Sequence, residues 1–93
     1  MFDIKKELHN LYVRLEKNND LINDYYTKIA NLHKEIRYHA FFIMNGKPCD
    51  LAYHSARIAE YSAQLEEYNT EVEMLKKDNE IIESDIESLE SEV

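Results

Sequence analysis

The sequence predicts an all-α protein, a long antiparallel helical hairpin whose two helices form a two-stranded coiled coil. Apolar residues recur at alternating spacings of three and four along most of the 93 residues, which is the pattern of a coiled coil. The only glycine and the only proline lie together in the stretch Asn45–Asp50, and the heptad patterns on either side match when the chain folds back there. We therefore expect one helical-hairpin domain over residues 1–93, with helices at 3–44 and 51–92 and a loop at 45–50.

The first predicted helix has a clear start and an unbroken apolar line. Asp3 suits the N-cap position, and Glu7 follows near the positive end of the helix dipole. The polar stretch 18–20 could divide this helix and produce a three-helix bundle, but the spacing passes through it without a slip, so one helix is favoured. The residues expected to face the second helix, here called the seam, are Ile4, Leu8, Leu11, Leu15, Asn18, Ile22, Tyr25, Ile29, Leu32, Ile36, His39 and Ile43.

The second predicted helix follows Pro48, with Asp50 as its expected cap. Its seam consists of Leu51, His54, Ile58, Tyr61, Leu65, Tyr68, Val72, Leu75, Asn79, Ile82, Ile86, Leu89 and Val93.

One register aligns the two seams along their whole length, the register in which facing residue numbers sum to 97. It places Asn18 opposite Asn79, and we expect this buried amide pair to cost stability but to set the register. It also places His39 opposite Ile58, and His54 opposite Ile43.

Charge and composition narrow the function classes. The net charge is −8, with eight basic and six acidic residues (+2) in residues 1–47 and three basic and thirteen acidic residues (−10) in residues 48–93. This balance disfavours direct binding to nucleic acid or to an anionic membrane. No apolar run approaches the length of a membrane span. A single cysteine cannot form an internal disulfide, so we expect a reducing, cytoplasmic location.

Four side chains near the loop are of types that carry chemistry: His39, Cys49, Asp50 and His54. A zinc site needs four converging ligands, and no paired-ligand motif supports one here. A two-helix hairpin also lacks a cleft that could hold a substrate. We therefore expect no catalytic residues, no metal and no cofactor, and the protein is not expected to be an enzyme.

The loop end carries a second apolar surface besides the seam. Small residues allow close approach of another helix, and aromatic residues anchor interfaces, so we interpret this surface as a partner interface. The alternative is that the aromatic residues only cover the end of the hairpin. The interface residues are Tyr38, Phe41, Phe42, Met44 and Tyr53, together with the alanines Ala52, Ala56, Ala59 and Ala63.

These observations predict a coiled-coil interaction or adaptor module that docks a protein partner through its loop end. We expect it to self-associate as a homodimer that forms a four-helix bundle over part of its length, because two helices cannot cover both the seam and a second apolar face.

An alternative function is an acidic inhibitor that occupies the basic groove of a nucleic-acid-binding protein. Lys5, Arg14 and Lys28, expected near Glu90, Asp85 and Glu71, would neutralise part of the acidic surface and so count against it. The acidic face of this alternative consists of Glu80, Glu83, Glu87 and Glu90.

Overall fold

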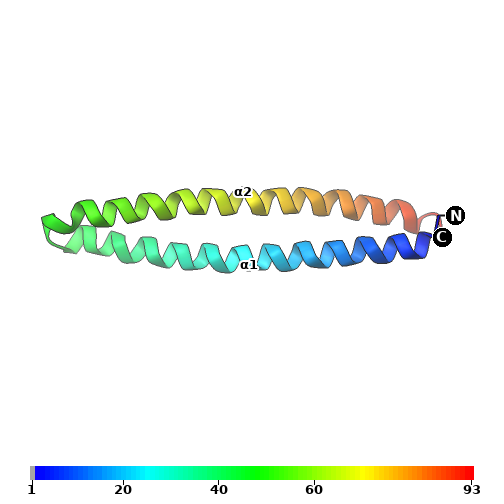
Figure 1. The fold of residues 1–93 in the computed structure, drawn as a ribbon, viewed down its shortest axis with the longest axis horizontal. Helices are drawn as coiled ribbons and strands as arrows, with labels where there is room; N and C mark the ends of the chain where they lie inside the picture. The colour runs from blue at the N-terminus through cyan, green and yellow to red at the C-terminus, as the bar shows by residue number, and fades with distance from the viewer. Residues whose placement is uncertain (1) are drawn as a thin grey trace. The chain divides into compact units, whose positions relative to one another are not determined.

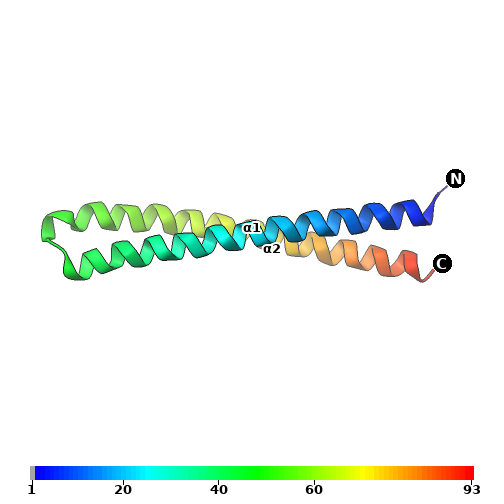
Figure 2. The same ribbon diagram turned by 90° about the horizontal axis from the view of Figure 1, so that it is seen from below.

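The computed structural model describes residues 2–93, apart from the side chain of Cys49, and it confirms the predicted fold class. Helix α1 spans Ile4–Asn45, a 3₁₀ turn η1 spans Pro48–Asp50, and helix α2 spans Leu51–Glu90. The two helices run in opposite directions as an antiparallel hairpin (Figures 1 and 2). Helix α1 is continuous through the polar stretch 18–20, so the three-helix alternative is wrong.

The start of α1 is capped as predicted. The Asp3 carboxylate accepts hydrogen bonds from the backbone N–H groups of Lys5 and Lys6, at 3.1 and 3.3 Å. These donors would otherwise lack a partner in the first turn of the helix.

Helix α1 ends, and the chain reverses, in a short hydrogen-bonded segment. The Asn45 amide donates to the Phe41 carbonyl at 3.1 Å, and the Gly46 N–H donates to the Phe42 carbonyl at 2.7 Å. Pro48 then opens η1, which leads directly into α2. Asp50, expected as the cap of α2, lies inside this turn, and its N–H donates to the Lys47 carbonyl at 3.0 Å. The reversal is therefore held mainly by main-chain carbonyls of α1 and of the turn.

The hairpin divides into two packing units, which we describe separately. Unit 1 combines the chain up to Asp24 with Val72–Val93, and unit 2 is Tyr25–Glu71. The buried core of unit 1 consists of Leu11, Ile82 and Ile86, with Leu8, Leu15 and Leu89 packed against it. All six lie at predicted seam positions, because residues at 4-3 spacing share one face of a helix.

Unit 1 also contains the predicted asparagine pair. The Asn18 amide donates to the Asn79 side-chain oxygen at 3.0 Å and to the Asp78 carboxylate at 2.7 Å. The Asn79 amide in turn donates to the Asn19 side-chain oxygen at 3.1 Å. The pairing of Asn18 with Asn79 is therefore confirmed, and it forms part of a four-residue network.

Unit 2 has a different interior. Leu32 is its buried apolar residue, and its buried polar residues are His39 and His54. Tyr25 and Tyr68 contact each other with ring centroids 5.6 Å apart, and the Lys28 ammonium lies over both rings. The seam of unit 2 thus combines seven aliphatic side chains with five rings, whereas the seam of unit 1 contains no ring. The five rings are Tyr25, His39, His54, Tyr61 and Tyr68.

Candidate functional site

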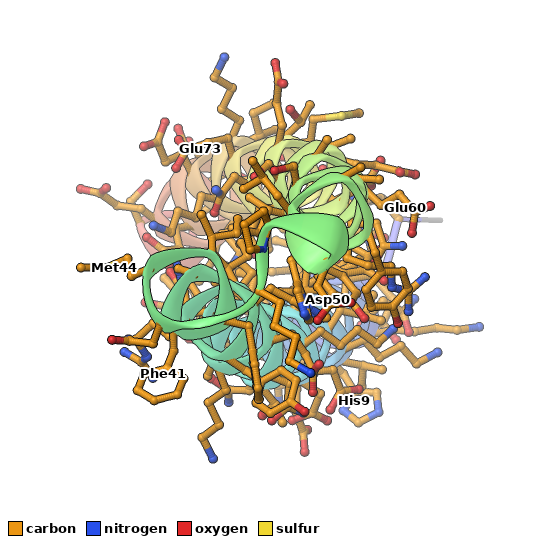
Figure 3. All side chains as sticks on the ribbon, turned by 90° about the vertical axis from the view of Figure 1, so that its left-hand side faces the viewer. His9, Phe41, Met44, Asp50, Glu60 and Glu73 are labelled. Carbon is orange, nitrogen blue, oxygen red and sulfur yellow. The ribbon has the colours of Figure 1, made fainter. Side chains whose placement is uncertain are left out.

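The predicted interface residues at the loop end differ in how far they reach solvent. Tyr38, Phe41, Met44 and Tyr53 are 56%, 58%, 83% and 60% exposed. Figure 3 shows Phe41 and Met44 projecting outward from α1 on the same side of that helix. Single exposed apolar residues are ordinary, but four at one end of a small unit are typical of an interaction surface.

Phe42 differs from these four. It is half-buried, and its ring stacks on His54 with centroids 5.1 Å apart and planes 12° apart. The Phe42 ring also makes edge-to-face contacts with Tyr38 and Phe41, with ring centroids 4.8 and 5.6 Å apart. Phe42 therefore connects the exposed aromatic residues to the interior of unit 2.

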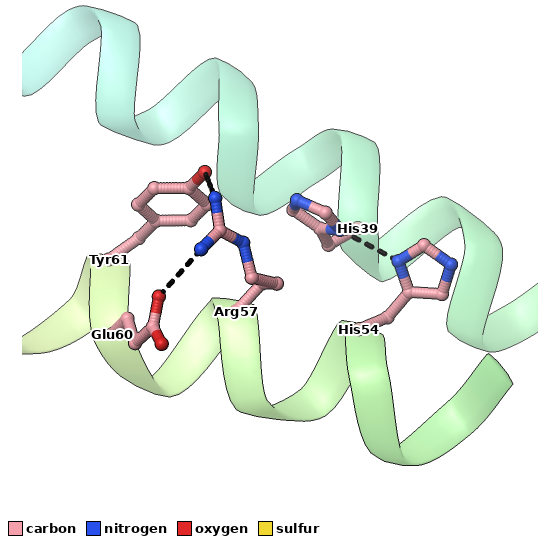
Figure 4. Close-up of polar contacts among 5 residues, drawn as sticks. All are labelled: His39, His54, Arg57, Glu60 and Tyr61. Atoms are coloured by element: carbon pink, nitrogen blue, oxygen red, sulfur yellow. Dashed lines mark hydrogen bonds and ion pairs between the residues drawn. The ribbon is translucent and has the colours of Figure 1, made fainter.

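The interior of the loop end is organised around His39 and His54. Their Nδ1 atoms lie 2.7 Å apart, within hydrogen-bonding distance (Figure 4), and the residues are only 4% and 9% exposed. One Nδ1 donates and the other accepts, and the tautomer of each ring determines which of the two donates. The register placed His39 in the layer of Ile58, but its hydrogen-bond partner lies in the neighbouring layer. A seam side chain packs between two facing residues, and here the polar neighbour is the one it bonds.

Arg57 contacts this cluster through Tyr61. Its guanidinium donates to Glu60 and to the Tyr61 hydroxyl, both at 2.9 Å (Figure 4), and lies 5.2 Å from the centre of the Tyr61 ring. The coulombic interaction with Tyr61 is the main cause that raises the pKa of Arg57; desolvation opposes it, and Glu60 adds a smaller raising effect. The rings of Tyr61 and His39 in turn contact each other, with centroids 5.8 Å apart. Sequence reasoning missed Arg57; the spacing to Glu60 and Tyr61, three and four residues on, is the signal that could have found it.

The alanines lie on a separate surface. Ala52, Ala56, Ala59 and Ala63 are all exposed, and they occupy heptad positions b and f of α2, the side turned away from the seam. Tyr38, Phe41 and Met44 lie at the corresponding b, c and f positions of α1. The structure therefore divides the predicted interface between the outer sides of two different helices.

No group of three or more His, Cys, Asp or Glu side chains gathers within the described residues. Of the candidates considered from the sequence, His39 and His54 are committed to each other, and the Cys49 side chain lies outside the described part. The nitrogen separation of 2.7 Å is also that of a hydrogen bond.

The four residues of the predicted acidic face, Glu80, Glu83, Glu87 and Glu90, are all exposed. Glu90 accepts a hydrogen bond from the Tyr12 hydroxyl, and this bond is the main cause that raises the pKa of Tyr12. Arg14, expected near Asp85, instead lies 3.5 Å from Asp78. Asp78 and Asp85 both occupy g positions of α2 beside the g position of Arg14, so heptad spacing allows either partner and side-chain reach selects Asp78.

A shallow hollow of about 580 Å³ lies in unit 1 where the two ends of the sequence meet, lined by Phe2, Asp3, Ile4, Lys5 and Val93. Val93, expected to complete the seam opposite Ile4, lies beyond the end of α2 and is 80% exposed. The hollow is mostly apolar and holds no cluster of titratable groups.

No helix in the described part of the chain is long and apolar enough to cross a lipid bilayer. Comparison with protein-family models, curated proteins and solved structures found no match to this chain.

Proposed function

We propose that this chain is a non-enzymatic interaction module that self-associates and docks a protein partner through its loop end. The observation that carries the proposal is the exposure of Tyr38, Phe41, Met44 and Tyr53, each more than half exposed on one small unit. Aromatic residues and methionine are enriched at interfaces because they bury much area for little lost conformational freedom. Their support by the ring cluster around His39 and His54 favours a preorganised surface.

An acidic inhibitor remains the second candidate function. Unit 1 contains six basic and thirteen acidic residues, a charge of −7, whereas unit 2 contains five and six, a charge of −1. Glu80, Glu83 and Glu87 are exposed, as a mimic of nucleic acid requires. The two candidates place the binding surface in different units, so they can be separated by mutation.

The deciding experiment is quantitative affinity capture from the native host with three full-length baits. One bait is the wild type, and one carries Phe41→Ala, Met44→Ala and Tyr53→Ala. The third carries Glu80→Lys, Glu83→Lys, Glu87→Lys and Glu90→Lys. We expect partners to be retained by the glutamate-reversed bait and lost by the loop-end bait, because apolar burial is little affected by charge. Circular dichroism checks that each bait is helical. The acidic inhibitor would be established instead by partners that still bind the bait with the three alanine substitutions, but that are lost from the glutamate-reversed bait and in raised salt.

A further inference from the structure

The outer face of α1 in unit 2 combines positive charge with apolar side chains. Residues at positions b, c and f recur at helical spacing, so they form one continuous strip about 15 Å long. Within this strip, Tyr38, Phe41 and Met44 are each more than half exposed. Neither Lys34 nor Arg37 has an ion-pair partner within 4.0 Å among the described residues. We call this strip the basic stripe; it consists of Lys34, Arg37, Tyr38, Phe41 and Met44.

The outer face of α2 in unit 1 carries the opposite combination. At successive heptads an acidic residue at position b is followed by an apolar residue at position c, and Met74 and Ile81 are 59% and 61% exposed. Lys77 is the one cation at the b, c and f positions of the described segment 73–88, and Glu73 lies 3.8 Å from Lys76. We call this strip the acidic stripe; it consists of Glu73, Met74, Glu80, Ile81 and Glu87.

The two stripes match in both charge and apolar character. Each places exposed large apolar side chains beside charges of one sign, and the signs are opposite. Such complementarity favours one pairing and penalises pairings of like charge. Every copy of the chain presents both stripes at equal concentration.

From this complementarity we infer that the basic stripe of one copy binds the acidic stripe of a second copy. This inference rests on the self-association clause of the proposed function and assigns that association to surfaces other than the alanines. Because Tyr38, Phe41 and Met44 also belong to the loop-end surface, a second copy and a docked partner compete for these side chains. Each contact joins two unlike surfaces. A dimer in which both stripes of each copy are paired is isologous, whereas contacts that use one stripe of each copy are heterologous and continue into a ring or a chain. The exposed Met74 and Ile81 are explained by this contact, since they have no role in the seam.

The test is a charge swap measured by sedimentation equilibrium on the full chain. Variant P carries Lys34→Glu and Arg37→Glu, and variant Q carries Glu80→Lys and Glu87→Lys. We expect the wild type to associate, and P and Q alone to associate roughly tenfold or more weakly, because like charges then face each other. An equimolar mixture of P and Q should regain association. The altered stripe of P is now acidic, and it can bind the altered stripe of Q, which is now basic.

Matched controls carry the same charge changes outside the stripes. Lys6→Glu with Lys17→Glu matches P, and Glu66→Lys with Glu67→Lys matches Q; both pairs of residues are exposed. These controls should associate like the wild type. Circular dichroism at the same concentrations shows whether any loss reflects unfolding.

Three results would overturn the inference, and they bear differently on the proposed function. If P and Q associate as well as the wild type and Ala56→Arg does not, self-association stands but proceeds through the alanine face. If the mixture of P and Q fails to regain what each variant has lost, the two stripes do not meet. A wild type that remains monomeric at every concentration removes both the inference and the self-association clause, while partner docking is still decided by the capture experiment.

Discussion

The two units share one seam pattern but fill it with different chemistry. Unit 1 buries aliphatic side chains and satisfies its one polar layer with an amide network. Unit 2 buries a single aliphatic residue, Leu32, and two hydrogen-bonded histidines surrounded by rings. The buried apolar residues of unit 1 are Leu11, Ile22, Val72, Ile82 and Ile86.

Heptad spacing therefore determines where the helices meet, while residue identity determines whether a unit has a dense aliphatic core or directional ring contacts. Aliphatic layers give unit 1 a dense core that stabilises the pair of helices. Rings and imidazoles give unit 2 directional contacts, which hold side chains in defined orientations. Of the exposed aromatic residues, Phe2 and Tyr12 lie on unit 1, whereas unit 2, with the more directional interior, carries four: Tyr26, Tyr38, Phe41 and Tyr53.

Comparing Ile82→Ala with Leu32→Ala tests whether unit 1 is the main source of stability. Ile82→Ala removes a fully buried side chain (0% exposed) and should lower the free energy of unfolding by about 4 kcal/mol, through lost burial and the cavity left behind. Leu32→Ala, at 8% exposure in unit 2, should cost about 2 kcal/mol, because Leu32 is less completely buried than Ile82. Urea unfolding of the two variants, followed by circular dichroism, measures both. Equal losses would mean that the two interiors contribute alike.

The next effect tests the histidine pair. His39→Phe or His54→Phe alone leaves a buried ring nitrogen without a partner and should cost roughly 1–3 kcal/mol. The double variant removes both polar groups and should lose clearly less than the sum of the single variants.

The chain provides matched controls for this cycle. His9 and His33 are exposed, so His9→Phe and His33→Phe should change stability by less than about 0.5 kcal/mol. Additive single effects at positions 39 and 54 would show that the two rings act independently in solution.

The smallest effect concerns the amide layer of unit 1. Asn18→Leu with Asn79→Leu should raise the free energy of unfolding by roughly 1 kcal/mol, because an apolar layer replaces a buried polar one. Asn19 is exposed, and Asp78 is only half-buried, so water can satisfy both after the change. Either single change should help less or destabilise, since the remaining amide loses its partner. Thermal unfolding of the three variants gives the comparison, and a destabilised double variant would contradict it.

Much of the fold could be predicted from the sequence. The unbroken 4-3 spacing predicted both helices, and the single Gly and Pro predicted the reversal; α1 and α2 begin and end within two residues of the expected positions. The Asn18–Asn79 pairing also followed, because polar residues at two seam positions align in only one full-length register.

The arrangement of the candidate site was less predictable. Spacing assigns a residue to a layer, but it does not specify which of two facing neighbours a side chain contacts, and His39 bonds the neighbour that offers a nitrogen. The half-buried position of Phe42 depends on ring stacking against His54, a contact between helices that heptad rules do not describe. Flank pairs such as Arg14 with Asp78 depend on side-chain reach rather than on layer number.

Gly46 limits how the sequence can change at the chain reversal. Its backbone does not adopt a positive φ, so conformational freedom is not what the position requires. A Cβ atom there would lie well inside 3.0 Å of the Phe42 carbonyl oxygen, the same oxygen that accepts the Gly46 N–H. Any other residue must open that hydrogen bond and loosen the last turn of α1, the turn that carries Phe42. The reversal therefore has no neutral alternatives at this position, and substitutions that alter its tightness also alter how the aromatic side chains beside it are presented.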